Sequence, residues 1–430
     1  MVNEMEAKSD SRARVAVIQA CWVLQIHTVN FVRLLVANGF EVDVFLVDVP
    51  ASYVDVDQLR QIRNVRIIEC QNRAPRTPPS RRLSFRVKRR ILRTLGSMLQ
   101  PFDVIGFWLG DRSLRFFMDR TAEREFAAQF NKRRSHYDLV IGVESVGLIL
   151  GHKHIARHTK LVYYSLELYL ERHPLYPYRR SFRQLKRLEN QAQADCVAII
   201  IQDLRRGKCL AEASGSVRPL ILLPVSLSQQ DCTSRGCTVR ESLGISAEKR
   251  IVIYFGAIRP SRYTRPIVEQ AQHFPEDWTL VVHSGGDVSA EELSELQALD
   301  VKKKVVFSLE NLPEASIHHF LVGADVGLVF YSKDSLNEFH TGYASEKAAR
   351  YAAAGIPFVA FDVPTFEEVF NLYHCGTGIS KMDHLPSAIT EIFSDYQRFQ
   401  QGAEAAFEHV YCFERHASSV VKSLRETISA

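Results

Sequence analysis

Apolar residues gather in short runs along the start of the chain, and their spacing changes from one run to the next. The run from Arg14 to Ala20 is apolar at almost every position, which is typical of a buried strand. A helical spacing of apolar residues follows from His27 to Ala37, Gly39 ends it, and a second strand-like run covers Glu41 to Val47. The pattern predicts a β-α-β unit at the start of the fold.

The same alternation continues along the chain and begins again near Arg250. Helical or polar segments separate the runs, which favours parallel sheets covered by helices on both faces. Because a strand-turn-helix start occurs twice, the sequence predicts an α/β protein with two Rossmann-like, doubly wound domains that face each other across a central cleft. The expected strands are Leu139 to Gly142, Leu161 to Ser165, Val197 to Ile201, Leu220 to Pro224, Ile251 to Phe255, Trp278 to His283 and Val305 to Ser308, with a helix from Pro266 to Phe274 and only helices from Pro386 to Ile428.

The most informative pattern lies between Ala324 and Phe370. It opens with an eight-residue apolar run, which predicts a buried strand, and continues into a polar loop that ends in Tyr343-Ala344-Ser345. An Ala-rich helix is predicted from Glu346 to Ala354, with Gly355 as its stop. A second apolar strand follows from Pro357 to Phe361.

The loop before this helix has the features of an anion site. Ser345 is placed to be the N-cap of the helix, and Lys347 falls in its first turn. Free N–H groups and the helix dipole make such an N-terminus a binding site for phosphorylated ligands. A lysine in the first turn opposes the dipole, and an anion in front of the helix would explain its presence.

Residues 345–359, SEKAARYAAAGIPFV, carry a family resemblance. They resemble the S-x-K-x-x-E-Y-x-A-x-G-x-P-V-V pattern in the donor-binding region of retaining glycosyltransferases of the GT-B fold, in particular glycosyltransferase family 4. Arg350 stands where that family usually has glutamate, and Phe358 replaces valine. The resemblance implies two Rossmann-like domains and a nucleoside-diphosphate sugar as co-substrate.

The resemblance also points to a second loop, after the expected strand Ile251 to Phe255. The family has a glycine-bearing turn there, with an Arg and a Lys on the diphosphate. Here Ala257 replaces the usual Arg, and Arg262 stands at the position of the Lys. The two loops together carry three cations, Arg259, Arg262 and Lys347, which would neutralise the leaving phosphates with no metal required. In the other interpretation, Arg259 and Arg262 are solvated loop charges. The donor-binding residues implied are Gly256, Arg259, Arg262, Tyr343, Ala344, Ser345, Glu346 and Lys347.

Family members commonly carry two glutamates separated by seven residues. Glu338 and Glu346 have that spacing. A register anchored on the glycine and proline of the motif instead places Gly342 and Arg350 at those positions, and we prefer it because it aligns more residues. In that register both glutamates are missing, and Glu346 either substitutes for the second one or pairs with Arg350, one helical turn away.

The catalytic residues implied in the first domain are Glu167 and His27. The stretch LVYYSLELYLERHP resembles the family's strand that ends in His-Asp, with Leu166 and Glu167 in those two places. Glu167 would orient the acceptor hydroxyl or take its proton, and Glu144 is the second candidate. His27 lies at the distance from Gly39 at which many family members carry a histidine facing the cleft. Either glutamate could instead cap the helix that follows it.

The domain organisation expected from these patterns is as follows. Residues 1–13 form a disordered tail, 14–228 the acceptor domain, 229–243 a linker, 244–404 the donor domain, and 405–430 a C-terminal helix that crosses back to the first domain.

Composition narrows the class of protein. The chain has 430 residues, 46% hydrophobic and 24% charged, and a net charge of +5, which does not indicate nucleic-acid binding. Eight scattered cysteines without a C-x-x-C pair do not predict a zinc site or a disulfide, even though Cys232 and Cys237 are close. The polar N-terminus and the lack of an apolar run of 18 residues favour a cytoplasmic protein.

Basic residues concentrate between Arg73 and Arg93, with nine Lys or Arg and no acid. Apolar residues interleave with them, so this segment either lies on an anionic membrane surface or is a solvated loop followed by an amphipathic helix.

The sequence as a whole predicts a retaining glycosyltransferase that moves a sugar from a nucleotide donor to a saccharide or lipid-linked acceptor, in cell-surface polysaccharide or glycoconjugate synthesis. The departures at Gly342, Arg350, Ala257 and Leu166 keep open a non-catalytic nucleotide-sugar-binding relative or partner subunit. A nucleotide-sugar epimerase on the same fold is the third interpretation.

Overall fold

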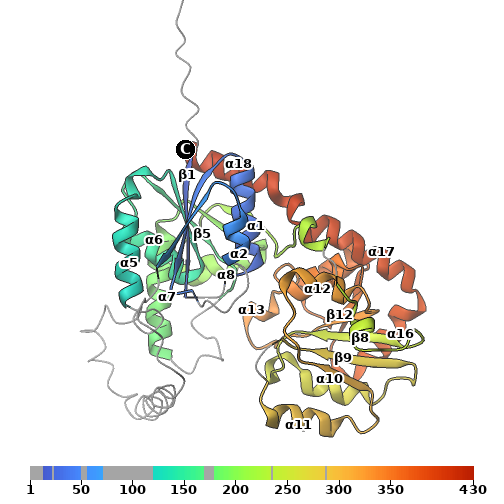
Figure 1. The fold of residues 1–430 in the computed structure, drawn as a ribbon. Helices are drawn as coiled ribbons and strands as arrows, with labels where there is room; N and C mark the ends of the chain where they lie inside the picture. Colours follow the sequence, from blue (N-terminus) through green and yellow to red (C-terminus); the bar gives the residue numbers. More distant parts are fainter. Residues whose placement is uncertain are drawn as a thin grey trace, which may run out of the picture.

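Two α/β units lie side by side in the computed structural model (Figure 1). The structure describes residues 13–21, 24–49, 56–70, 120–168, 179–233, 236–285 and 288–430. Residues 1–12 of the predicted tail and the basic stretch Arg73 to Arg93 lie outside the described residues.

The first unit is built around a seven-stranded parallel sheet with strand order β3-β2-β1-β4-β5-β6-β7. Its elements are β1 (Arg14–Ala20), α1 (Ile26–Ala37), β2 (Glu41–Val47), α2 (Val56–Gln61), β3 (Val65–Cys70), α5 (Arg120–Asn131), β4 (Leu139–Val143), α6 (Glu144–His154), β5 (Lys160–Tyr164), α7 (Arg179–Ala194), β6 (Ala198–Ile201), α8 (Leu204–Ser214) and β7 (Leu220–Leu222). Helices α5, α6 and α7 cover one face of the sheet, and α1, α2 and α18 (Phe413–Ser429) cover the other (Figure 1).

The second unit repeats this plan with a six-stranded parallel sheet of order β10-β9-β8-β11-β12-β13. Its elements are β8 (Arg250–Phe255), η5 (Pro260–Arg262), α10 (Thr264–Ala271), β9 (Trp278–His283), α11 (Ala290–Leu299), β10 (Val305–Ser308), α12 (Glu314–Leu321), β11 (Val326–Val329), α13 (Leu336–Phe339), α14 (Glu346–Ala353), β12 (Phe358–Phe361), α15 (Pro364–Tyr373), β13 (Gly376–Ile379), α16 (Leu385–Ser394) and α17 (Tyr396–Ala406). In both sheets the strand order reverses beside the first strand of the unit, which is where such folds bind ligands. The predicted fold class is confirmed.

The strands coincide with the apolar runs because each central strand is buried on both faces. In β1 all residues after Arg14 are buried. Two strands were not predicted. β3 lies at a sheet edge and is mostly half exposed, and β13 has the sequence GTGI, whose glycines give no strand signal.

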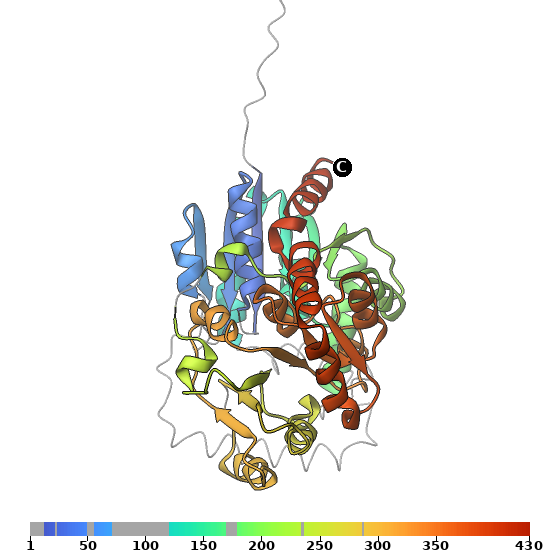
Figure 2. The ribbon, with the colours of Figure 1, turned by 90° about the vertical axis from the view of Figure 1, so that its right-hand side faces the viewer.

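The units are connected by a short segment and by a returning helix. The short segment contains η4 (Gln229–Cys232) and α9 (Val239–Ser242), both within the stretch predicted to be a linker. After α17 the chain runs back from the second unit to the first, where α18 packs on α1 and β7 (Figures 1 and 2). The backbone of Leu227 bonds to Tyr411 and Phe413, so both crossings of the chain are tied together.

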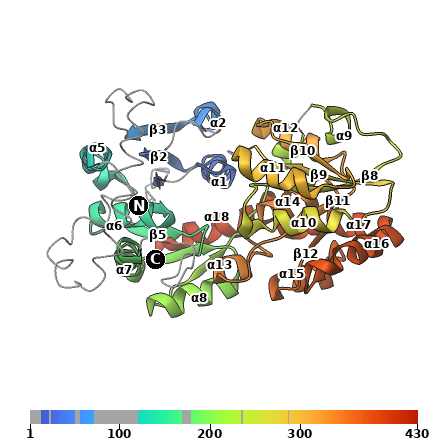
Figure 3. The same cartoon turned by 90° about the horizontal axis from the view of Figure 1, so that it is seen from below.

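The short helix α13 lies at the junction of the two units (Figure 3). Asn337 on α13 hydrogen-bonds to Glu167 and Leu168, which follow β5. A second junction is the backbone bond from Val225 N–H to the carbonyl of Tyr343, 2.9 Å. The loops at the carboxyl ends of β5 and β11 therefore meet, and the site is built there.

Close packing of α6 on the first sheet generates a stability prediction. A Cβ on Gly147 would lie 2.3 Å from the carbonyl oxygen of Ile18, whereas a Cβ on Gly151 would meet only side-chain methyl groups at 3.2 Å. G147A should lower the free energy of unfolding by about 1–3 kcal/mol because the backbone cannot give way. G151A, in the same helix, should be near neutral because a helix gains about 1 kcal/mol from Ala over Gly. Urea-unfolding midpoints of both variants test this, and equal midpoints would contradict it.

Candidate functional site

The N-terminus of α14 is fixed by Ser345. Its hydroxyl accepts the N–H of Ala348 at 3.1 Å and shares a 2.9 Å hydrogen bond with the hydroxyl of Tyr331. The predicted N-cap is therefore present, and it ties α14 to the loop that leaves β11.

Lys347, in the first turn of α14, lies between two aromatic rings. Its Nζ is 4.4 Å from the ring centre of Tyr254 and 5.0 Å from that of Tyr331, and it donates to the Tyr254 hydroxyl at 3.3 Å. A Cβ on Gly256 would lie 2.6 Å from Lys347 Cε, so a larger residue there would displace the end of the lysine side chain. Burial, with the charge of Arg262 adding to it, lowers the pKa of Lys347 to about 7.

Arg262 brings a second cation to the same aromatic ring. Its guanidinium lies 4.7 Å from the centre of the Tyr331 ring, and Nη1 lies 2.8 Å from Glu338 Oε1. The ion pair is not aligned as a hydrogen bond, and the buried Nη1 and Glu338 Oε2 have no hydrogen-bond partner among the described residues. Burial raises the pKa of Glu338. Two cations on one tyrosine repel each other, and an anion between them would relieve this.

Arg350 forms a buried ion-pair network with Glu346 and Glu314. One guanidinium nitrogen lies 2.6 Å from a carboxylate oxygen of each glutamate, and Nε donates to Glu346 at 2.8 Å. Burial would raise the pKa of Glu346, but Arg350 and then His27 outweigh it and hold that pKa well below its ordinary range. The carboxylate stays 44% exposed and faces His27 Nε2 at 3.6 Å. Glu346 therefore pairs with Arg350 and also faces the opposite domain.

Gly342 is a position at which the predicted motif register expects a glutamate, and the packing leaves no room for one. A Cβ there would lie 2.4 Å from the carbonyl oxygen of Thr365. The N–H of Gly342 donates to the Thr365 hydroxyl, and its carbonyl accepts the Tyr411 hydroxyl at 2.6 Å. The segment is thus closely enclosed on both sides.

Glu144 and Glu167 lie together at the carboxyl ends of β4 and β5. Glu144 Oε1 accepts the N–H groups of Leu166 and Glu167 at 2.7 and 2.9 Å. Burial and then the charge of Glu167 raise the pKa of Glu144 to about 8. Glu144 also has φ +58°, a left-handed conformation that is uncommon for residues other than glycine. It holds the turn after β5, whereas Glu167 is only half-buried.

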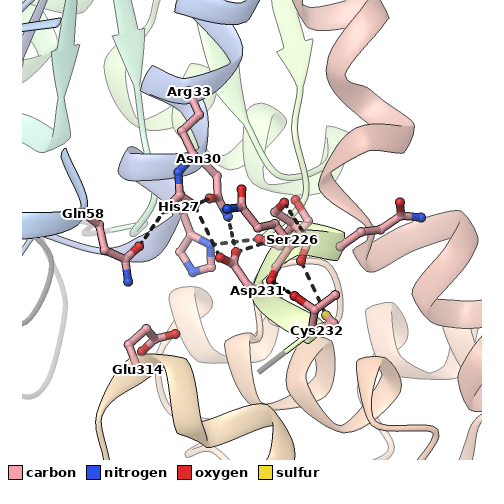
Figure 4. Close-up of polar contacts among 12 residues, drawn as sticks. His27, Asn30, Arg33, Gln58, Ser226, Asp231, Cys232 and Glu314 are labelled. Carbon is pink, nitrogen blue, oxygen red and sulfur yellow. Dashed lines mark hydrogen bonds and ion pairs between the residues drawn. The ribbon is translucent and has the colours of Figure 1, made fainter. Parts of the chain in front are cut away.

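His27 belongs to a polar cluster between α1 and the linker (Figure 4). Its Nδ1 lies 3.2 Å from the carbonyl oxygen of Ser226, and since a carbonyl only accepts, Nδ1 carries the hydrogen. Asn30 donates to Asp231 at 2.8 Å, and Arg33 forms an ion pair with the same carboxylate at 3.4 Å. This face of α1 is fastened to the linker, and Nε2 of His27 is left to face Glu346.

The residues predicted from the sequence do not all lie in one place. Lys347, Arg262, Ser345 and Gly256 gather around the rings of Tyr254 and Tyr331, which the sequence did not single out. Arg259 is exposed and forms no ion pair with any described residue. Tyr343 and Ala344 lie in the turn before α14 and contribute backbone bonds to Val225 and Thr341, and Glu346 is engaged by Arg350.

Other residues of the site had little or no sequence signal. Glu338 has a sequence signal, because seven residues separate it from Glu346, but the preferred motif register places Gly342 at the glutamate position instead. Arg206 and Asn337, which connect the domains, had none. No cluster of three His, Cys, Asp or Glu side chains suitable for a metal ion occurs among the described residues.

The buried network of Arg350 generates a second stability prediction. R350M leaves the carboxylates of Glu314 and Glu346 without their shared cation, so it should cost about 3 kcal/mol. R265M removes the exposed Arg265–Glu269 pair, which has the same four-residue spacing, and should change stability by less than about 1 kcal/mol. Melting temperatures of the two variants test this, and equal values would contradict it.

Comparison with solved structures places this fold. Sucrose-phosphate synthase from Thermosynechococcus elongatus aligns with a TM-score of 0.70 and 14% identity over 97% of this chain and 100% of that one. Anabaena HepE, solved in complex with UDP-glucose, aligns with a TM-score of 0.62 and 12% identity over 96% of this chain and 99% of that one. WaaG, a glycosyltransferase involved in lipopolysaccharide biosynthesis, aligns with a TM-score of 0.58 and 13% identity over 97% of this chain and 100% of that one. No protein-family model matches the sequence, and no curated protein matches it significantly. The likeness is one of fold, and the chain has the two-domain GT-B fold of these structures.

Proposed function

We propose that this protein is a retaining glycosyltransferase that moves a sugar from a nucleoside-diphosphate sugar to a saccharide or lipid-linked acceptor. The observation that carries the proposal is the pair of cations, Arg262 and Lys347, on the ring of Tyr331. They lie at the N-terminal end of α14, whose free N–H groups and dipole also favour an anion. A diphosphate is the anion that this arrangement suits best.

Donor cleavage places negative charge on the leaving diphosphate. As the bond between the anomeric carbon and the phosphate oxygen breaks, the electron pair goes to that oxygen, and preorganised cations stabilise it. Arg262 and Lys347 would hold this charge, with Ser345 fixing the start of α14 behind them. These two cations and the helix N-terminus would carry the charge of this step without a metal.

The acceptor would enter from the first domain, where Glu167 lies. Its carboxylate is half-buried, and one oxygen accepts from Asn337 at 2.7 Å. Glu167 would orient the acceptor hydroxyl and take its proton as the oxygen bonds to the anomeric carbon. Glu144 is less suited to this role because its Oε1 is engaged by two backbone N–H groups.

A lipid-linked acceptor agrees with peripheral attachment to the cytoplasmic face of a membrane, through the basic segment Arg73 to Arg93. That segment lies outside the described residues, so its support is the sequence pattern alone. No described helix is long and apolar enough to span a bilayer. Vesicle flotation with Arg81, Arg82, Arg89 and Arg90 changed to Glu tests the attachment.

The pKa of Lys347 leads to a prediction about donor binding. With a pKa of about 7, most of the lysine is neutral at pH 8 in the free protein, and a bound diphosphate will favour its charged form. Binding of UDP-glucose or another nucleotide sugar should therefore take up nearly one proton at pH 8 and far less at pH 6, and affinity should fall as the pH rises above 7. Calorimetry in HEPES and in Tris measures the uptake.

The control variant is K333M. Lys333 lies in the loop between β11 and α13 and pairs with Asp362, so K333M should keep the proton uptake, whereas K347M should lose it together with most of the affinity. Equal uptake by K347M and the unaltered protein would show that another group is protonated.

The proposed function is tested with UDP-, GDP- and ADP-sugars. At least one should raise the melting temperature, because a ligand that binds only the folded state stabilises it. Incubation with saccharide and lipid-linked acceptors should then release the nucleoside diphosphate, and NMR of the product should show the donor's anomeric configuration. Binding without turnover would favour a non-catalytic relative, an altered sugar in the absence of acceptor would favour an epimerase, and no binding at all would overturn the proposal.

A further inference from the structure

We propose that Asn337 and Arg206 are positioning residues that orient the carboxylate of Glu167 only when the two domains are docked. The inference rests on the proposed function, in which Glu167 receives the acceptor's proton. It assigns a role to α13, a four-residue helix in the loop between β11 and α14.

Asn337 is the point at which the donor domain reaches Glu167. Its Nδ2 donates to Glu167 Oε2 at 2.7 Å, and its Oδ1 accepts the N–H of Leu168 at 2.6 Å. Arg206 Nη2 also donates to Oδ1, at 2.9 Å. Because two donors point at Oδ1, the other end of the amide is the NH2 group, which can only donate to Glu167.

Arg206 holds this amide from the first domain. It is 1% exposed, and its guanidinium donates to Gln202 and the carbonyl of Leu166 within its own domain. Across the junction it donates to the carbonyls of Asn337 and His340 at 3.0 and 3.2 Å. A buried guanidinium needs all of these acceptors, so it fixes α13 in one position against the turn after β5.

Glu167 is therefore held by one anchor from each domain. Glu144, in the first domain, fixes its backbone N–H, and Asn337, in the second, fixes its carboxylate. If the domains separate, the backbone anchor remains, but the side chain is free to rotate. Docking of the domains and orientation of Glu167 are thus the same event.

The same helix also contacts the donor site. Glu338, the residue after Asn337, pairs with Arg262, one of the two cations proposed to bind the diphosphate. One short helix thus touches both the donor cation and the acceptor carboxylate. A displacement of α13 would change both sides of the reaction together.

A purely structural role in docking is the alternative, and a second inter-domain ion pair separates the two. Arg205 Nη2 lies 3.3 Å from Glu368 on α15, also across the junction, but neither side chain contacts Glu167. R205A should therefore leave catalysis unchanged, whereas a positioning residue should affect turnover more than donor affinity.

The first test is N337A, which removes the amide and leaves one N–H of Arg206 and the N–H of Leu168 without their acceptor. We expect its kcat to fall about 100-fold, as for other misplaced catalytic groups, with a nucleotide-sugar Kd within about threefold of the unaltered protein. R206K keeps the positive charge but loses the planar guanidinium group, and its kcat should fall in the same way. An unchanged kcat in N337A, or an equal fall in R205A, would overturn the inference.

The second test is the pH profile of N337D. The introduced oxygen faces the Glu167 carboxylate, and the two negative charges repel until one proton is shared between them. Activity relative to the unaltered protein should therefore rise as the pH falls from 8 to 6, whereas N337A should stay low throughout. A merely structural loss would give two flat profiles.

The third test does not depend on turnover. Among the described residues, the N–H of Leu168 is bonded only to Asn337, so N337A should speed its hydrogen exchange at least about 10-fold, whereas R205A should not. If no nucleotide sugar binds to the unaltered protein, the proposed function fails, and this exchange measurement alone decides whether α13 holds the turn after β5. Unchanged exchange in N337A would overturn the inference even in an active enzyme.

Discussion

The site depends on keeping positive charge half-buried at the carboxyl edge of the second sheet. Lys347 lies between the rings of Tyr254 and Tyr331, and Arg262 lies against the second of these rings. Desolvation of an ammonium costs free energy, and the lowered pKa of Lys347 expresses that cost. The faces of the two aromatic rings offset part of this desolvation cost, and the ion pair of Glu338 with Arg262 offsets another part. A bound anion would offset the rest of this cost.

Packing around this edge accounts for Gly342 and Arg350, the two positions at which the predicted motif register expects glutamate. Thr365 and Tyr411 enclose Gly342, so a glutamate there would require the segment to move. The charge of Arg350, at the second of these positions, is compensated by Glu314 and Glu346. A carboxylate, that of Glu346, stays half exposed and faces His27. The site therefore keeps a negative charge even in the predicted register, which has no glutamate at positions 342 and 350.

The sequence was sufficient for the fold because hydrophobic periodicity and glycine stops are local signals. The strands Arg14–Ala20, Glu41–Val47 and Trp278–His283 have the predicted bounds, since largely buried parallel strands are mostly apolar. The edge strand Val305–Ser308 also has the predicted bounds, although most of it is only half-buried. The N-cap role of Ser345 is equally local. The partners of the site are not. Arg206 and Asn337 are 131 residues apart, and nothing in either neighbourhood shows that they meet. Glu338 gave a spacing signal, but spacing alone could not show that it faces Arg262.

The backbone of Glu144 is strained, which lowers the stability of the fold at the candidate site. A non-glycine residue at φ +58° is unfavourable by about 1 kcal/mol or more, and its carboxyl is buried beside a second acid. Helix-turn geometry alone would be satisfied by a glycine, which has no such penalty. What a glycine cannot supply is the oxygen that accepts the N–H groups of Leu166 and Glu167. A strained, buried glutamate at position 144 is therefore explained if the position of Glu167 matters more for the protein than the stability lost at Glu144.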